Sequence, residues 1–536
     1  MKARIYIFLF LAGLGLTVIA STFQDSPGYM DADYYFLGGR QIARGQSFSD
    51  PVLWNYLDDP QGLPHPANSY WMPLASLVAA GGQLMTGQDS FGAAQLGFIL
   101  LSGLISPVTA GLTFALTEQR RAAIFAGLIA LFPFFYAPFL ATTDTFAVMM
   151  VLGGLFLILA GKLIAGEGQT TGWNQFTPLF LGLLAGLMHL ARADGLIWLF
   201  CGGLGIILAF RRLEPKVHSR GQPGFLVSSL GLLALGYLLV MGPWSARNLN
   251  VFGTLLSPGG ARAVWMAEYD ELFSYPATTL NFERWFATGL AEIARARVNA
   301  LLANLTHTLV VQGQIFLAPL ALVGMWKLRR DLRVQIGLLA WGLTFLIMTF
   351  IFPFPGVRGG LFHSGAAVQT LIWAAVPVGL CHLIDLGGRY RGWNTEQAWM
   401  VFQAGVILIA AFFSGVIFFN RVIGREFMHP VWDAPRRQYE NIGRWLDAQN
   451  TVETERVLIN NPVGFYLAAE RPAVVIPSSG VESVLDVAER YQVAFLVLEE
   501  NHPAPLAELY RSPGDRSGLT FIGSIESSHI FRSDSK

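Results

Sequence analysis

Long apolar stretches separated by short polar loops dominate the chain. A run of about 17–25 mostly apolar residues is long enough to cross the hydrocarbon core of a bilayer. Such stretches lie at residues 5–22, 91–117, 121–140, 144–165, 177–191, 195–210, 224–243, 307–326, 334–354, 366–384 and 398–420. The pattern predicts about eleven membrane-spanning helices.

Residues 71–87 form a further apolar stretch, and the charges decide where it lies. If this stretch does not cross, the basic loops fall on the same side as Lys2 and Arg4. Those loops carry Arg120, Arg121, Lys162, Arg211, Arg212, Lys216, Lys327, Arg329, Arg330, Arg333, Arg389 and Arg391. Cytoplasmic loops carry an excess of Lys and Arg. We therefore predict an interfacial or re-entrant segment at 71–87, a cytoplasmic N-terminus and an extracytoplasmic C-terminus.

The chain changes character after the last apolar stretch. Helix-like stretches at 437–450 and 483–491 alternate with short runs rich in β-forming residues. These runs are 456–459, 473–476, 494–498 and 520–525. Such alternation is typical of a small α/β domain. The expected fold is thus an all-α polytopic membrane domain, residues 1–420 with an outer loop at 23–90, followed by an extracytoplasmic α/β domain, residues 421–536.

Composition narrows the class of protein further. Of the 536 residues, 53% are hydrophobic and 13% are charged, whereas soluble domains carry about 25% charged residues. This excludes a water-soluble enzyme and a disordered scaffold. Lys plus Arg and Asp plus Glu both number 36, so no basic excess points to nucleic acid. Membrane lipids are the expected surroundings.

Ionisable side chains collect at the predicted outer ends of the spans. They are Asp31, Asp33, Asp144, Arg192, Asp194, Arg247, Arg358 and His363, with His65 in the first outer loop. A charge at membrane depth costs about 2.5–3.5 kcal/mol, so such groups tend to be paired or functional. Each residue alone is equally well explained as an ordinary interfacial charge. Together they predict a polar site at one membrane face.

A motif in the first outer loop connects this site to a known class of enzyme. Residues 27–35 read Pro-Gly-Tyr-Met-Asp-Ala-Asp-Tyr-Tyr, and a helix-like stretch up to residue 45 follows. The segment resembles the first-loop motif of GT-C membrane glycosyltransferases, which include protein O-mannosyltransferases and aminoarabinose–lipid A transferases. Asp31, Tyr35, Arg40 and Gly45 match the motif in order and spacing. Weaker matches follow in order at His65-Pro66, Thr142-Thr143-Asp144, Leu190 to Gly195, and Pro243 to Asn248.

The resemblance implies transfer of a sugar from a polyprenyl-phosphate donor to a lipid, protein or glycan acceptor. The reaction would invert the anomeric centre at the extracytoplasmic face of the plasma (inner) membrane. It needs a carboxylate to take the proton of the acceptor. Asp33 is favoured slightly on chemistry because it leads directly into the helix with Tyr34 and Tyr35, whereas motif alignment favours Asp31. Both remain candidates for the base.

The other polar residues are expected to bind substrate. Cations should stabilise the leaving lipid phosphate, and the candidates are Arg247, Arg358, His363 and His65; relatives often carry lysine where this chain has His65. Asp144, Arg192 and Asp194 are expected to shape the acceptor site or orient the loop helices, and Tyr35 and Arg40 are assigned to substrate binding by the motif. No cofactor and no metal are required, although a pair of aspartates could hold a divalent ion.

Two other classes of protein compete with this interpretation. One is a non-catalytic GT-C-like scaffold that binds glycan, and the sequence alone does not exclude it. The other is a transporter or flippase for lipid-linked sugars. Transporters usually show inverted repeats and charges near the membrane midplane, whereas no repeat is evident in this chain and its charges cluster at one face.

Overall fold

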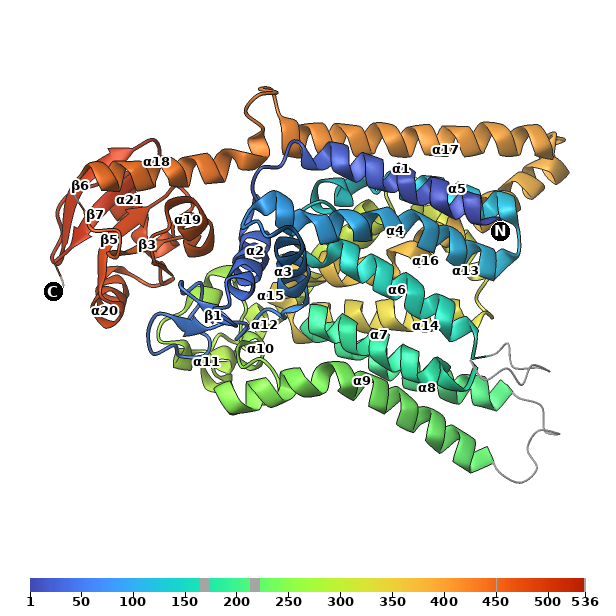
Figure 1. Ribbon diagram of the computed structural model, residues 1–536, viewed down its shortest axis with the longest axis horizontal. Coiled ribbons are helices and arrows are strands. Elements are labelled where there is room, and N and C mark those ends of the chain that lie inside the picture. The colour runs from blue at the N-terminus through green and yellow to red at the C-terminus, as the bar shows by residue number, and fades with distance from the viewer. Residues whose placement is uncertain (164–173, 213–221, 450, 535–536) are drawn as a thin grey trace.

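The protein is an elongated helical bundle with a small sheet-containing region at one end (Figure 1). The computed structural model describes residues 1–163, 174–212, 222–449 and 451–534. The end of the predicted span 144–165 and the basic residue Lys216 therefore lie outside the described residues. The N-terminus lies at the end of the bundle opposite the C-terminal sheet (Figure 1).

Seven helices among the described residues are long and apolar enough to cross a membrane. They are α1 (Ala3–Ser21), α4 (Phe91–Thr117), α8 (Leu196–Arg212) with the turn η3 (Ala193–Gly195), α9 (Gln222–Phe252), α14 (Leu332–Leu346) with η8 (Ile347–Ile351), α16 (Gly360–Arg391), and α17 (Thr395–Phe418) with η9 (Phe419–Ile423). Three shorter apolar helices accompany them, α3 (Leu74–Thr86), α6 (Thr145–Gly161) and α7 (Thr177–Ala191). These helices make the chain a multi-pass membrane protein, whereas the predicted number of eleven spans stays a prediction.

Two of the predicted spans are not continuous helices. In 121–140, α5 (Arg120–Ala130) ends before Pro133, and the short 3₁₀ segment η1 (Phe134–Phe139) follows. Proline ends the helix because it lacks an N–H donor and clashes with the preceding turn. In 307–326, the π-helix η7 (His307–Gln312) and α13 (Ala318–Lys327) are separated by a turn. Gln314 and Ile315 have φ of 47° and 53° in that turn, so the helix cannot continue through it.

Helix α16 is the central helix of the bundle. Most residues in its N-terminal two-thirds are buried, and the helix packs against α4, α5, α6, α13 and α14. Its contact with α6 is close because Gly153 of α6 lies directly against the backbone of Ala367. A Cβ atom at residue 153 would overlap the carbonyl oxygen of Ala367. The glycine therefore sets the distance between the two helices that carry much of the site described below.

We expect Gly153→Ala to destabilise the protein by about 1–3 kcal/mol, because α6 and α16 must move apart to admit the methyl group. The measurement is the melting temperature of the purified protein in detergent. Gly15→Ala is the matched control, since nothing lies within 4 Å of a Cβ at Gly15 in α1. Equal melting temperatures for the two variants would contradict this account of the contact.

The first outer loop lies between the bundle and the sheet (Figure 1). It contains α2 (Met30–Ala43), the two-residue strands β1 (Ser49–Asp50) and β2 (His65–Pro66), and α3. α3 packs between α2 and α4. At 1.5 Å per residue its 13 residues cover about 20 Å, less than the roughly 30 Å core of a bilayer. In the rest of the loop, the rings of Trp54 and Trp71 stack on each other with their centroids 3.8 Å apart.

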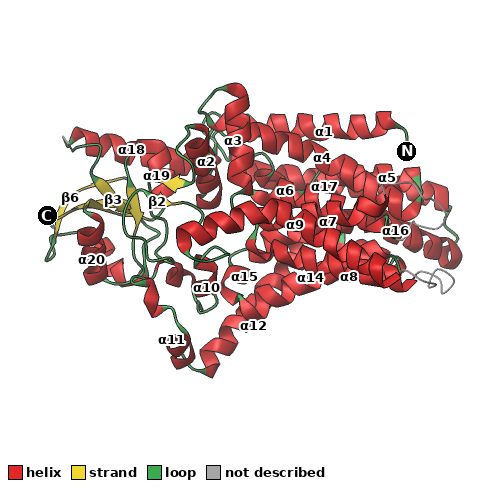
Figure 2. Cartoon of the chain, turned by 60° about the horizontal axis from the view of Figure 1, so that its bottom comes forward, coloured by secondary structure: helices red, strands yellow, loops and turns green. Residues whose placement is uncertain are grey.

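Further short helices cover the same end of the bundle. They are α10 (Gly259–Ala263), η5 (Tyr269–Phe273), η6 (Ala277–Thr279), α11 (Phe282–Ala287), α12 (Leu290–Thr306) and α15 (Pro353–Val357). Figure 2 shows α11 and α12 reaching outward below the sheet region. Asn304, near the end of α12, links the π-helices η7 and η8. Helix α12 leads into η7, and the Asn304 side-chain amide donates to Met348 O and Thr349 Oγ1 of η8.

The C-terminal region forms a mixed five-stranded sheet with strand order β4-β3-β5-β7-β6. Its elements are α18 (Ala434–Ala448), β3 (Arg456–Ile459), α19 (Pro462–Ala469), β4 (Ala473–Val475), α20 (Val481–Tyr491), β5 (Val493–Leu498), α21 (Ala507–Arg511), β6 (Leu519–Ile525) and β7 (Ser528–Ser533). The strands β3, β4, β5 and β6 lie where the sequence predicted them. The sequence analysis missed β7, which pairs with both β5 and β6, and it missed α19.

The sheet region is docked on the first outer loop by backbone as well as side-chain contacts. Leu53 pairs with β4, donating to Ala473 O at 3.0 Å and accepting from Val475 N at 2.8 Å. The hydroxyl of Tyr491 donates to the carbonyl of Pro60 at 2.7 Å. The two regions are therefore connected by the kind of hydrogen bonds that hold a sheet together.

A buried acid in the sheet region gives a prediction for stability against pH. Burial raises the pKa of Glu499 to about 7, although hydrogen bonds from Asn460 and Tyr439 oppose the shift. Between the ordinary pKa of a glutamate and pH 7 the folded state binds a proton that the unfolded state releases. Stability therefore falls as pH rises through this window, by on the order of 3 kcal/mol in total. We expect Glu499→Gln to flatten the pH dependence of the melting temperature between pH 5 and 8, whereas the neighbouring Glu500→Gln should leave it unchanged.

Candidate functional site

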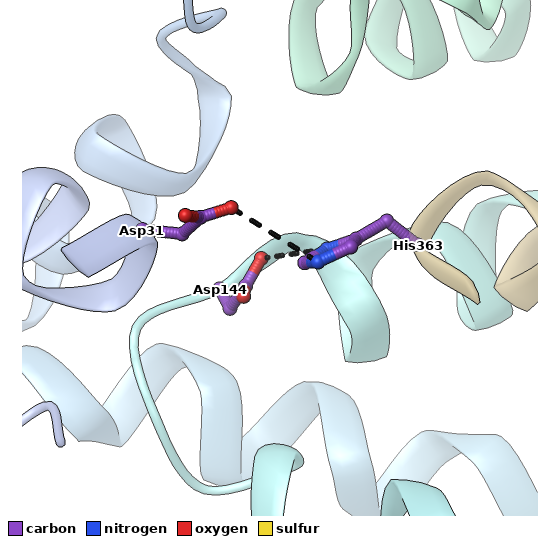
Figure 3. Close-up of side chains that lie close together, drawn as sticks. All are labelled: Asp31, Asp144 and His363. Carbon is purple, nitrogen blue, oxygen red and sulfur yellow. Dashed lines mark ion pairs between the residues drawn. The ribbon is translucent and has the colours of Figure 1, made fainter. Parts of the chain in front are cut away.

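Asp31, Asp144 and His363 lie close together (Figure 3). Helix α2, which carries Asp31, lies between the bundle and the sheet (Figure 1). His363 Nδ1 lies 3.5 Å from Asp144 Oδ1, and His363 Nε2 lies 4.0 Å from Asp31 Oδ2. One ligand atom from each residue lies within 4.8 Å of the other two. The imidazole is thus placed between two carboxylates that come from distant parts of the chain.

Each of the three side chains is positioned by the start of a helix. Asp31 is in the first turn of α2, and His363 is in the first turn of α16. Asp144 is the N-cap of α6, where its carboxylate accepts hydrogen bonds from the backbone and hydroxyl of Thr145 and from the hydroxyl of Tyr29. Asp144 is fully buried, whereas a third of the Asp31 side chain is exposed. Asp31 is therefore the carboxylate that a substrate can reach.

The surroundings of Asp31 suit a group that exchanges protons. Burial raises the pKa of Asp31 to about 6; the charges of His363, Arg192 and Arg358 oppose this shift, and the charge of Asp144 adds to it. A general base works best when its pKa is near the working pH. The Asp31 carboxylate is therefore accessible to a substrate, and its pKa lies near neutral pH.

Arg192 and Asp194 adjoin this cluster from the turn between α7 and α8. Arg192 Nε lies 3.2 Å from Asp194 Oδ1 and donates to Ser364 Oγ of α16 at 2.9 Å. Tyr35 is buried near the cluster, and the charges of Asp144, Arg192 and Asp31 act on its pKa. Burial raises the pKa of the Tyr35 hydroxyl well above its ordinary value, so this hydroxyl stays protonated and can donate.

Arg358 supplies an available positive charge beside Asp31. Its guanidinium lies over the Tyr269 ring, 3.7 Å from the ring centre. The side chain is exposed, and it has no ion-pair partner among the described residues. An exposed arginine held against a ring can bind an anion without breaking an existing pair.

Asp33 and Arg40, both predicted site residues, face the C-terminal region instead. Asp33 Oδ2 accepts a hydrogen bond of 2.8 Å from Asn461 Nδ2. Arg40 Nη2 lies 2.6 Å from Glu470 Oε1. Asp33 is therefore tied to α19, and the geometry places Asp31, not the slightly favoured Asp33, among the other site residues.

His65, in the outer loop, and Arg247, on α9, both have partners within that loop. His65 Nε2 lies 2.7 Å from Asp58 Oδ2. Arg247 donates to the carbonyl of Ala67 at 2.8 Å, and its guanidinium lies 4.9 Å from the Trp244 ring centre. These contacts explain both residues as supports of the loop, and they leave Arg358 and Arg192 as the arginines whose charges act on Asp31.

Sequence reasoning missed several residues that complete the site. Tyr29 holds Asp144, Tyr269 holds Arg358 and Ser364 holds Arg192. Tyr29 is only two residues before Asp31, so the motif could have drawn attention to it. The other two have common side chains on segments without a motif, and only the folded arrangement reveals them.

The three clustered residues also fit a divalent cation. Carboxylate oxygens and an imidazole nitrogen form a donor set that such ions accept. His363 Nδ1 is buried and has no hydrogen-bond partner among the described residues, which agrees with a role as ligand. The same geometry also fits a protonated imidazole held between two carboxylates.

The sequence matches no protein-family model and no curated protein. Solved structures do resemble it. The oligosaccharyltransferase of Archaeoglobus fulgidus, in a complex with Zn and sulfate, aligns with a TM-score of 0.56 and 14% identity over 92% of this chain and 67% of its own. ArnT from Cupriavidus metallidurans, bound to undecaprenyl phosphate, aligns with a TM-score of 0.53 and 14% identity over 99% of this chain and 98% of its own. The same A. fulgidus enzyme, AglB, in complex with an inhibitory peptide and a dolichol-phosphate, aligns with a TM-score of 0.50, 13% identity and coverage of 92% and 69%.

These alignments extend over nearly the whole chain, including the C-terminal region. At such low identity they establish a shared fold, and it is the fold that the first-loop motif led us to expect.

Proposed function

We propose that this protein is a membrane glycosyltransferase that moves a sugar from a polyprenyl-phosphate donor to an acceptor. The observation that carries the proposal is the accessible carboxylate of Asp31 beside Asp144, His363 and the available cation Arg358. The shared fold with ArnT, which was solved with undecaprenyl phosphate, supports a lipid-phosphate ligand. The reaction takes place at the extracytoplasmic face of the plasma membrane.

Asp31 acts as the general base in this proposal. Its carboxylate takes the proton of the acceptor nucleophile while the acceptor attacks the anomeric carbon. The bond between that carbon and the phosphate oxygen breaks in the same displacement, so the configuration inverts. The Asp144 carboxylate lies 3.5 Å from His363 Nδ1, and hydrogen bonds from Tyr29 and Thr145 fix that carboxylate.

The departing lipid phosphate carries the developing negative charge. Arg358 is positioned to bind it through the two parallel N–H donors of a guanidinium. Arg192 adds a second positive charge near Asp31. Stabilising charge that develops in the transition state is often the largest contribution to such a rate.

A divalent cation is a second way in which the same residues can work. Asp31, Asp144 and His363 would hold it, and the cation would supply positive charge next to the leaving phosphate. The oligosaccharyltransferase from A. fulgidus was solved with Zn. Activity that survives exhaustive chelation would show that the side chains suffice.

We place the chemistry in a transmembrane catalytic domain, residues 1–420, and assign residues 421–536 to a C-terminal extracytoplasmic domain. The test is transfer of labelled sugar from a panel of polyprenyl-phosphate donors by the purified protein with lipid, peptide and glycan acceptors. We expect free polyprenyl phosphate and labelled acceptor in equal amounts. Movement of intact donor across a vesicle membrane would identify a flippase, and binding of glycan without either activity would identify a scaffold.

A further inference from the structure

Helix α2 has two functional faces. Successive residues of an α-helix are about 100° apart, so residues four or seven positions apart share a face. Asp31 and Tyr35 are four apart and lie with the polar cluster. Asp33 and Arg40 are seven apart and lie on the opposite face, where they contact Asn461 and Glu470, the residues that precede and follow α19.

At the start of α19, the buried carboxylate of Asp33 is matched by a hydrogen-bond donor. Asn461 Nδ2 donates to Asp33 Oδ2 at 2.8 Å, while Asn461 Oδ1 accepts from the backbone N–H of Gly464 at 3.0 Å and caps α19. A Cβ atom at Gly464 would lie 2.9 Å from Asp33 Oδ2, so the carboxylate packs directly on that glycine. Asn461 thereby links the start of α19 to the start of α2, and Asp31 is two residues from this link.

A second contact fixes the other end of α2. The Arg40 side chain is buried, and its guanidinium pairs with Glu470 at the end of α19 and lies 5.9 Å from the Tyr466 ring centre. α19 therefore holds α2 at two points that are two helical turns apart. Two fixed points restrict both rotation and tilt of a helix.

We propose that Asn461 and Glu470 are positioning residues, which hold the far face of α2 so that Asp31 is kept opposite Asp144 and His363. This inference rests on the proposed function, since its consequence is a faster chemical step. A displacement of about 1 Å of a reacting group can lower a rate by about a hundredfold. Loss of the contact should therefore lower kcat and leave KM for the donor nearly unchanged, because Arg358 and His363 lie on other segments.

The test compares a variant that breaks the contact with one that rebuilds it. Asn461→Ser retains an oxygen to cap α19 but is too short to reach Asp33. The exchange Asp33→Asn with Asn461→Asp reverses the hydrogen bond, because the amide introduced at residue 33 then donates to the carboxylate introduced at residue 461. The other oxygen of that carboxylate still caps α19. We expect kcat to fall about 10- to 100-fold in the first variant and to return to within about threefold of wild type in the second.

Asn441→Ser is the matched control, since Asn441 also donates its amide to a carboxylate, Glu526, but does so away from α2. Wild-type kcat in Asn461→Ser would overturn the inference. An exchange variant that is folded yet remains inactive would also overturn it, because Asp33 would then be needed for its own carboxylate.

Hydrogen–deuterium exchange of the α2 amides separates this inference from the function on which it rests. If the α2 amides exchange hydrogen faster in Asn461→Ser and return to the wild-type rate in the double variant Asp33→Asn with Asn461→Asp, the docking of α2 is supported even if wild type transfers no sugar. Absence of transfer by wild type would overturn the proposed function alone. Unchanged exchange in Asn461→Ser would overturn the positioning role.

Discussion

Asp31→Asn is expected to lower kcat for sugar transfer by about 10²–10⁴-fold, the usual contribution of a general base. The amide has nearly the same shape as the carboxylate but cannot accept the proton of the acceptor. Binding of the donor should change little, because the cations around the site remain. Single-turnover transfer at saturating donor, together with a direct binding measurement, separates the two effects.

The pH dependence gives an independent check on this role. Because burial raises the pKa of Asp31 to about 6, the base is protonated and inactive below that pH. The rate should rise about tenfold per pH unit below 6 and level off above it. Asp31→Asn should lack this rising limb. A wild-type rate that falls as pH increases from 5 to 7 would contradict the assignment.

Asp25→Asn is the matched control for Asp31→Asn. Asp25 is an exposed carboxylate in the same outer loop, outside the cluster of Asp31, Asp144 and His363. It should retain wild-type activity. Similar losses in both variants would point to a general effect of charge in the loop.

Arg358→Ala is expected to lower kcat/KM by about 10²–10³-fold, the range found when one stabilising donor to a developing charge is removed. The guanidinium is exposed and held against Tyr269, so its loss should leave folding intact. Arg358→Lys should recover only part of the activity, because an ammonium group lacks the two parallel donors of arginine. The measurement is initial-rate kinetics with the donor varied.

Arg329→Ala is the control for Arg358→Ala. Arg329 is also exposed, and it also lies over an aromatic ring, 4.6 Å from the centre of Trp326. It belongs to the loop between α13 and α14, which is outside the cluster around Asp31. Equal losses in the two variants would show that the arginine–ring contact matters for stability and that Arg358 does not bind the phosphate.

The sequence predicted the kinds of side chain in the site better than it predicted which residues lie together there. Asp31, Asp144, Arg192, Arg358 and His363 could be identified because ionisable groups are rare in apolar chains and these lie at span ends. The contacts of Asp33 with Asn461 and of Arg40 with Glu470 could not be predicted, because these partners are more than 400 positions away along the chain. Side chains two residues apart on a helix point in nearly opposite directions, and the sequence does not say which face meets the bundle.

The fold, too, could be predicted from the sequence only in part. Apolar length predicts where helices lie, and β-rich runs predicted four strands of the sheet. The interruptions after Ala130 and Gln312 were missed because average hydropathy is insensitive to a single proline or to a turn with positive φ. Strand β7 was missed because polar residues interrupt the run Ser528–Ser533, which pairs between β5 and β6 only in the folded sheet.

The most direct test of the account is release of polyprenyl phosphate from a labelled sugar donor in proteoliposomes, with wild type and Asp31→Asn measured side by side. We expect wild type to release polyprenyl phosphate and to label an acceptor in equal measure. We expect Asp31→Asn to bind the donor but to release no polyprenyl phosphate above background. Equal release by the two proteins would contradict the role of Asp31. A folded wild-type protein that binds the donor and leaves the sugar on the lipid with every acceptor would contradict the transferase function itself.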